Sequence, residues 1–319
     1  MRTPIFVVAL ISLIGSNAVR AATFTTIIDP ANPTFTEALG INNSGTVVGY
    51  GNASTPNGFV LTPPSTFTRQ NFPGADGGTQ VHGIDSAGHT VGSSTTSGST
   101  SGFYQSGGAF TAVNQPGTVF NQLLGINQAG TTAAGYASST DTSGATGQHA
   151  YTYNISGQTF TPVSSLPTNT NSQATGVNNS GMIVGFYQLL SGKYSAFTDV
   201  GGTITSFLVP GSQSTQALGV NDLGQIVGDY VDSSGTMFGF LDTGGTFTTI
   251  NPPGATSTTA NGINDLDQIV GFYTDANGAT LGFETTVVTP LPAALPLFAT
   301  GLVGLVLLGW RRKKKPAAG

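Results

Sequence analysis

The residues able to do acid–base or metal chemistry are sparse in this chain. Its only histidines are His82, His89 and His149, and it has no cysteine. His82 and His89 flank one predicted turn, whereas His149 lies elsewhere in the pattern, so the three predict no metal cluster. No GxSxG, P-loop or HExxH motif occurs. We expect no metal, no cofactor and no catalytic residue, with each histidine facing solvent or packing between strands.

Carboxylates are the remaining candidates, and they are densest in the last third of the chain: Asp222, Asp229, Asp232, Asp242, Asp265, Asp267 and Asp275. Asn-Asp pairs in predicted turns could supply oxygen ligands to calcium, but no DxDxDG-type loop accompanies them. We interpret these aspartates as a solvated acidic face. A glycosidase needs two paired carboxylates. The only glutamates, Glu37 and Glu284, lie at opposite ends of the repeat region, which argues against that activity.

These side chains are carried on an internal repeat. The segment ALGINNSGTVVGY (38–50) returns five times in altered form, with its leading glycine at Gly40, Gly83, Gly125, Gly176, Gly219 and Gly262. The spacings are 43, 42, 51, 43 and 43 residues. The long third unit has its excess in polar stretches, 140–147 and 167–172, where loops tolerate insertion.

Each unit contains a predicted hairpin turn. Two residues after the glycine comes an Asn or Asp, at Asn42, Asp85, Asn127, Asn178, Asn221 and Asn264. Its side chain can bond the backbone ahead, and the Gly three residues later accepts the left-handed conformation that ends the loop. Asp267 replaces that Gly in the sixth unit, and Asp also visits the left-handed region.

Four short strands are predicted in each unit. The first ends at the Gly-Ile or Gly-Val pair and the second follows the turn. The third begins at an aromatic residue, namely Phe59, Phe103, Tyr151, Phe197, Phe240 or Phe283. The fourth follows a Gly-rich turn, as in TFTTINPPG (246–254). Four strands in about 43 residues is the proportion of one propeller blade.

The first residues after the apolar leader indicate how the repeats close. TFTTIIDP (23–30) nearly copies TFTTINPP (246–253), although no full unit precedes it, and the sixth unit lacks a fourth strand after Glu284. Residues 22–288 therefore predict an all-β, six-bladed β-propeller closed by its N-terminal strand, which leaves no long sheet edge exposed. An open β-solenoid is the alternative, but it leaves the N-terminal strand unexplained.

The charge distribution argues against nucleic acid as a partner. All 14 acidic residues lie in 22–288, together with only Arg69 and Lys193 of the nine basic ones. A body of that sign repels phosphate backbones, so we expect no nucleic-acid binding. Because cysteine is absent, stability must come from burial and strand pairing.

Both termini carry export signals. Arg2, an apolar run (5–14) and small residues around Ala21 predict a signal peptide over 1–21; an uncleaved anchor is the alternative, but the run is too short for a hydrocarbon core of about 30 Å. At the other end, a proline segment (289–296) precedes an apolar run (297–310) that predicts a transmembrane helix. A basic cluster follows, made of Arg311, Arg312, Lys313, Lys314 and Lys315, which predicts a cytoplasmic stop.

The tail, residues 289–319, resembles the PEP-CTERM sorting signal in its VPLPA-type variant, with Thr289 inserted after Val288 and the motif continuing as Pro290, Leu291, Pro292 and Ala293. The resemblance implies a Gram-negative bacterium, a transient inner-membrane anchor, cleavage near the prolines by an exosortase-like peptidase, and delivery to the cell surface or biofilm matrix. A plain single-pass anchor is the alternative.

The repeat unit also resembles extracellular HAF repeats, at His149-Ala150-Tyr151 and Ser195-Ala196-Phe197, while the other copies have a degenerate signature. That resemblance implies an extracellular, non-catalytic protein. We therefore predict an exported structural or adhesive protein that engages extracellular polysaccharide or surface proteins. The alternative is a propeller enzyme acting on that polysaccharide.

Overall fold

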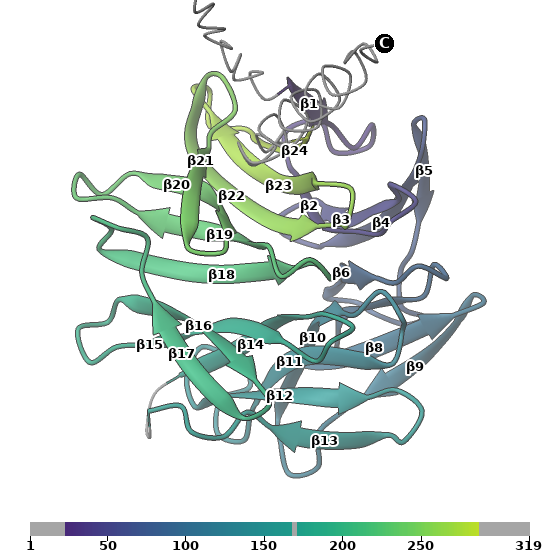
Figure 1. Cartoon of the computed structure of the whole chain (residues 1–319). Coiled ribbons are helices and arrows are strands. Elements are labelled where there is room, and N and C mark those ends of the chain that lie inside the picture. The colour runs from purple at the N-terminus through teal and green to yellow at the C-terminus, as the bar shows by residue number, and fades with distance from the viewer. Residues whose placement is uncertain (1–22, 168–170, 287–319) are drawn as a thin grey trace, which may run out of the picture. The chain divides into compact units, whose positions relative to one another are not determined.

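The computed structural model describes residues 23–167 and 171–286. The secondary structure of these residues consists of β-strands, which form six antiparallel sheets of four strands each. The sheets are arranged as the blades of a propeller (Figure 1). The prediction of an all-β, six-bladed β-propeller is confirmed, and the open solenoid is wrong.

Each of the first five blades is a meander in chain order. Blade 1 is β2 (Thr36–Ile41), β3 (Val47–Gly51), β4 (Asn57–Thr62) and β5 (Thr66–Arg69); blade 2 is β6 (Gly78–Ile84), β7 (Thr90–Thr96), β8 (Ser99–Ser106) and β9 (Ala109–Val113). Blade 3 is β10 (Phe120–Ile126), β11 (Thr132–Ser138), β12 (Gln148–Asn154) and β13 (Thr159–Pro162); blade 4 is β14 (Ser172–Val177), β15 (Ile183–Gln188), β16 (Tyr194–Val200) and β17 (Thr203–Phe207). Blade 5 is β18 (Ser214–Val220), β19 (Ile226–Val231), β20 (Met237–Thr243) and β21 (Thr246–Ile250); blade 6 is β22 (Ala255–Ile263), β23 (Gln268–Asp275), β24 (Thr280–Thr286) and β1 (Thr23–Ile27).

The predicted signal peptide (1–21) and sorting tail (289–319) lie outside the described residues, and so do the residues of the sorting motif and of the basic cluster. Within 23–167 and 171–286, no helix has the length and apolar character needed to span a bilayer.

The predicted turn joins the first and second strands of every blade. In blade 1, Gly45 N donates to Asn42 O at 3.0 Å, and Asn42 Oδ1 accepts from Ser44 N and Thr46 N. The glycine that ends each turn has a positive φ, as at Gly45, Gly88, Gly130, Gly181 and Gly224. Asp267 adopts φ 60° in the sixth turn, so the predicted turn chemistry is confirmed in all six units.

The same turn asparagines also tie neighbouring blades together. Asn178 Nδ2 donates to Asn221 O at 3.0 Å, Asn221 Nδ2 to Asn264 O at 3.0 Å, and Asn264 Nδ2 to Asn42 O at 2.9 Å. The last of these bonds joins blade 6 to blade 1. Asp85 has no amide to donate, and its Oδ2 instead lies 2.8 Å from His89 Nδ1.

The six repeat glycines allow the innermost strands to approach one another. A Cβ added to Gly125 would lie 2.5 Å from Thr175 O of the next blade, and one added to Gly262 would lie 3.0 Å from Leu39 O. Real Cβ contacts are rarely so short, because atoms repel steeply at these distances. The remaining repeat glycines would meet the following blade at 2.5 to 3.3 Å: Gly40, Gly83, Gly176 and Gly219.

The six predicted third-strand aromatics are at most 1% exposed: Phe59, Phe103, Tyr151, Phe197, Phe240 and Phe283. Each stands opposite a glycine of the second strand, as Phe59 does opposite Gly49. A Cβ on Gly49 would lie 2.9 Å from the Phe59 ring, so the glycine leaves room for that ring. Because buried aromatic rings dominate the apolar area of a core, these six anchor the blades.

Strand β1 closes the ring as predicted. It pairs with β24, with Thr26 opposite Phe283, and so completes the sheet that the last repeat begins. Phe24 packs on Phe283 with ring centroids 5.8 Å apart, as Phe67 packs on Phe59 at 5.1 Å within blade 1. The copied TFTTI sequence therefore makes the same contact from the opposite end of the chain.

An ion pair between the exposed Arg69 and a buried carboxylate fastens the closing strand to blade 1. Asp29, which follows β1, is fully buried, and its Oδ2 accepts from Arg69 Nη1 at 2.8 Å and from Asn32 Nδ2 at 2.7 Å. Burial raises the pKa of Asp29, but the bonds from Arg69, Asn32 and Ala31 N outweigh burial and hold it below its ordinary value. The carboxylate therefore stays charged and paired at neutral pH.

Candidate functional site

Three residues before each repeat glycine, the inner strands carry a ring of mostly amide side chains: Glu37, Gln80, Gln122, Gln173, Gln216 and Thr259. In the same blade order, their partners on the second strands are Tyr50, Ser93, Tyr136, Phe186, Asp229 and Phe272. Directly opposed residues of two antiparallel strands share one face of the sheet. Four blades thus pair a polar side chain with an aromatic ring, and blade 5 instead pairs Gln216 with Asp229.

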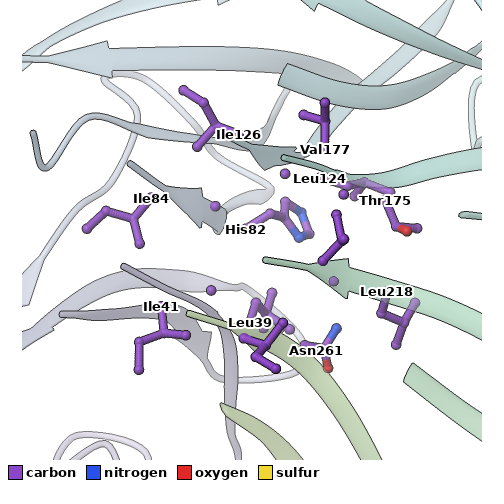
Figure 2. Close-up of a pocket in the computed structure, with 18 of the residues that line it drawn as sticks. Leu39, Ile41, His82, Ile84, Leu124, Ile126, Thr175, Val177, Leu218 and Asn261 are labelled. Carbon is purple, nitrogen blue, oxygen red and sulfur yellow. The ribbon is translucent and has the colours of Figure 1, made fainter. Parts of the chain in front are cut away.

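One residue before each glycine, a second ring narrows the channel: Leu39, His82, Leu124, Thr175, Leu218 and Asn261. The strand register shifts at this position in every blade, which is a β-bulge. Figure 2 shows the His82 ring in the space between the inner strands, and Leu218 and Asn261 also line that space. This constriction ring lines a space of about 60 Å³ on its turn side.

On the other side of the constriction ring the channel widens into a cavity of about 470 Å³. We call it the mouth cavity; Glu37, Tyr50, Gln173, Phe186, Asp229 and Phe272 are among the residues that line it. Its volume falls in the range of small-ligand sites, about 300–1,000 Å³. Aromatic surfaces together with a few placed polar groups are the usual lining of such sites.

Two carboxyl groups in the mouth cavity are perturbed by burial. Asp229 is 5% exposed, and burial raises the pKa of its carboxyl to about 7. Burial also raises the pKa of Glu37, although a hydrogen bond with the Tyr50 side chain partly offsets it. Both groups therefore hold a proton at higher pH than an exposed carboxyl would.

The remaining ionisable groups of the cavity are neutral near pH 7. Burial lowers the pKa of His82 to about 4, and its Nε2 lies 3.4 Å from Ser93 Oγ. Burial and the neighbouring Glu37 raise the pKa of Tyr50 above its ordinary value. Asn261 points into the channel, and its buried Oδ1 has no hydrogen-bond partner among the described residues. The cavity thus offers neutral hydrogen-bonding groups and two carboxyls.

The structure changes the interpretation of several residues. His89 binds Asp85 and His149 is exposed, whereas His82 lines the channel. In the described part of the chain, no three His, Cys, Asp or Glu side chains are grouped as metal ligands would be. Asp229 is buried in the mouth cavity, so its assignment to a solvated acidic face is wrong.

Glu37 lies at one end of the repeat region in sequence, but a closed ring has no end, and Glu37 lines the same cavity as Asp229. Sequence reasoning did not identify this site. Its signal is present in the repeats, because the position three before each glycine is Gln in four units. An alignment of the six units on their repeat glycines shows this position directly and would have identified the ring of polar side chains.

No protein-family model matches this chain, and no curated protein sequence matches it. Solved structures do resemble it. Virginiamycin B lyase from Staphylococcus aureus has a TM-score of 0.50 and 12% identity, over 84% of this chain and all of that one. The Aleuria aurantia lectin in complex with Fucα1-6GlcNAc has 0.48 and 13%, over 82% and 97%. The propeller domain of the Trilobed protease from Pyrococcus furiosus has 0.48 and 8%, over 81% and 99%. The likeness to the first of these, at 12% identity, shows the fold alone.

The Asp229 carboxyl should make stability depend on pH. Below about pH 4 it is protonated in both states, whereas between pH 4 and 7 only the unfolded chain ionises, so the unfolding free energy falls as pH rises. Asp229→Asn should flatten this fall and raise the unfolding free energy at pH 8 by up to about 4 kcal/mol, since each pKa unit corresponds to about 1.4 kcal/mol. Urea unfolding from pH 4 to pH 8 measures both effects.

Asp232→Asn is the matched control, because Asp232 lies in the turn after β19 and its Oδ1 accepts from Ser234 N and Thr236 N. Asparagine can accept the same bonds, so this variant should keep the wild-type fall between pH 4 and 7. An Asp229→Asn profile identical to wild type would contradict the burial argument.

Proposed function

We propose that this chain is an exported binding protein of a bacterial surface, whose mouth cavity engages extracellular polysaccharide without cleaving it. The observation that carries the proposal is the pairing of an amide or carboxyl side chain with an aromatic ring around one cavity of about 470 Å³. Glu37 with Tyr50 and Gln173 with Phe186 supply this pairing in the cavity, and blade 6 adds the hydroxyl of Thr259 beside Phe272.

The chemistry of sugars fits such a lining. A pyranose ring has hydroxyl groups around its edge and apolar C–H faces. Glutamine amides both donate and accept hydrogen bonds, so Gln80, Gln173 and Gln216 are matched to hydroxyl groups. The rings of Phe186 and Phe272 supply rigid apolar surface for the faces.

Export is supported by the sequence at the two ends of the chain. The leader (1–21) and the tail (289–319) agree on one topology, in which the propeller lies outside the cytoplasm and the basic cluster inside. The tail resembles a signal that an exosortase-like peptidase cleaves. The protein would then pass from a transient inner-membrane anchor to the cell surface or matrix.

A glycan-cleaving enzyme is the second candidate, and the paired carboxyls favour it. Glu37 and Asp229 line one cavity, and burial raises the pKa of both. Glycosidases use one protonated carboxyl as acid and a second as base or nucleophile. Products released from a glycan by the wild type but not by Asp229→Asn would establish this activity and overturn the non-catalytic proposal.

A glycan array should show binding by the propeller, with no change in the chain length of the bound glycan. Gln173→Ala removes one amide of the mouth cavity and should weaken that binding about tenfold, the effect of one hydrogen bond. Gln105→Ala is the matched control, since Gln105 lies on the third strand of blade 2, and it should bind as wild type does. Equal affinity of the two variants would contradict a site at the mouth.

Mass spectrometry of the protein recovered from the growth medium tests the sorting proposal. We expect an N-terminus near Ala22 and a C-terminus near Pro292 in cells that have the sorting peptidase. Cells without that peptidase should retain the full tail in the membrane. Secreted protein that still carries Lys315 would refute processing.

A further inference from the structure

The carboxyl groups of the mouth cavity have no cation to neutralise them within the described residues. There, the ion pairs within 4 Å join Arg69 to Asp29 and His89 to Asp85. Arg69 and Lys193 are the two Lys or Arg residues of this part of the chain. Lys193 Nζ donates to Gln213 Oε1 at 2.6 Å. His82 is uncharged, as its lowered pKa shows. Without a cation nearby, the empty cavity favours the protonated form of Asp229, and the ionised form needs a ligand that supplies a counter-charge.

Asp229 is the more unusual of the two carboxyls. It is 5% exposed, and none of the described residues donates a hydrogen bond to it within the usual distance. By contrast, Asp199 accepts from Gly202 N and Asp242 from Gly245 N. Burying a carboxyl without partners is costly, so such groups are rare unless a partner arrives. The unsatisfied Asp229 faces the cavity, where a ligand can supply the missing donors.

A metal ion does not fit this position. Calcium takes six to eight oxygen ligands, and other metals need several ligating side chains in one place. The described residues contain no group of three His, Cys, Asp or Glu side chains that could hold one. Glu37 and Asp229 are the carboxyls that line the mouth cavity, too few for a carboxylate-rich metal site, so we consider an organic cation.

Aromatic rings around the carboxyl favour the same class of ligand. Tyr50, Phe186 and Phe272 line the mouth cavity with Asp229, each at the same register position of its own blade. Ring faces attract an organic cation within about 6 Å of the centroid, and recognition of ammonium groups uses such rings together with an anion. Carboxylate and rings together match an ammonium group on a carbon skeleton.

We propose that the mouth cavity binds its glycan through an amino sugar residue, whose ammonium group donates to the Asp229 carboxylate. This inference rests on the proposed polysaccharide-binding function and names the ligand class of that same site. It predicts discrimination against the N-acetylated form of the same sugar, which carries no charge. Polymers of uronic acids are disfavoured, because their carboxylates would meet Glu37 and Asp229.

The space beside Asp229 lets a longer chain leave the cavity. A groove of about 260 Å³ shares Gln216, Asp229 and Met237 with the mouth cavity and continues to Tyr194 at the start of β16. Lys193 also lines this groove, where its amine donates to Gln213 Oε1 and makes no ion pair with Asp229 within 4 Å. It lies along the boundary of blades 4 and 5, since β16 belongs to one and β19 to the other. An amino sugar at Asp229 can therefore be one unit of a polymer.

The test compares a glucosamine tetramer with the N-acetylglucosamine tetramer by isothermal titration at pH 5.5, where the free amine is charged. Wild type should bind the glucosamine tetramer at least tenfold more tightly, the size of one charge-assisted hydrogen bond. Asp229→Asn should remove that preference, while the control Asp232→Asn should keep it.

Titration in buffers of different ionisation enthalpy measures the protons released on binding, and this readout needs no variant. Because the free Asp229 carboxyl is largely protonated at this pH, binding of the ammonium should release a proton.

The outcomes separate this inference from the function on which it rests. Equal binding of the two tetramers, or a preference that survives Asp229→Asn, overturns the amino-sugar inference but leaves glycan binding in place. Binding of neither tetramer also overturns it, and the glycan array then decides the wider function independently. A preference for the glucosamine tetramer without proton release contradicts the role of Asp229.

Discussion

The structure depends on how closely six strands approach one channel. At each repeat glycine the neighbouring blade occupies the place where a side chain would begin, at 2.5 to 3.3 Å from an added Cβ. This close approach leaves only a narrow space at the turn end of the channel. The residues one and three positions before each glycine are two residues apart, so they share one face of the strand, and most of them line the channel. The site is therefore a consequence of the packing that closes the ring.

The site also requires the first and last repeats of the chain to meet in a closed ring. Strand β1 gives blade 6 its outer strand, Arg69 of blade 1 holds Asp29 after β1, and the Asn264 amide reaches Asn42 O. Only in the closed ring does Glu37 of the first repeat line the same cavity as Asp229 of the fifth. An asymmetric site thus arises from nearly identical repeats, through substitutions at single register positions.

Much of the fold could be predicted from the sequence, because turn glycines, turn asparagines and the copied TFTTI segment each have one local physical meaning. The cavity could not be derived in the same way. Asp229 follows Gly228 in an apolar strand, and nothing near it in sequence shows that it will be buried opposite Gln216. His82 and Glu37 are separated from Asp229 by whole blades, so their meeting depends on ring closure and on the bulge. Local patterns predicted the blades, whereas the chemistry lies in positions that long-range geometry brings together.

Close contact between the inner strands, and not the conformational freedom of glycine, requires glycine at the channel. Denaturant unfolding of Gly125→Ala tests it directly, because Gly125 lacks a positive φ and alanine suits its backbone. We expect a loss of about 3 kcal/mol, since the new Cβ would lie 2.5 Å from Thr175 O. Gly157→Ala is the control: its Cβ would meet the Asn154 side chain, which can move, and it should change stability by under about 0.5 kcal/mol. Equal stability of the two variants would contradict the account.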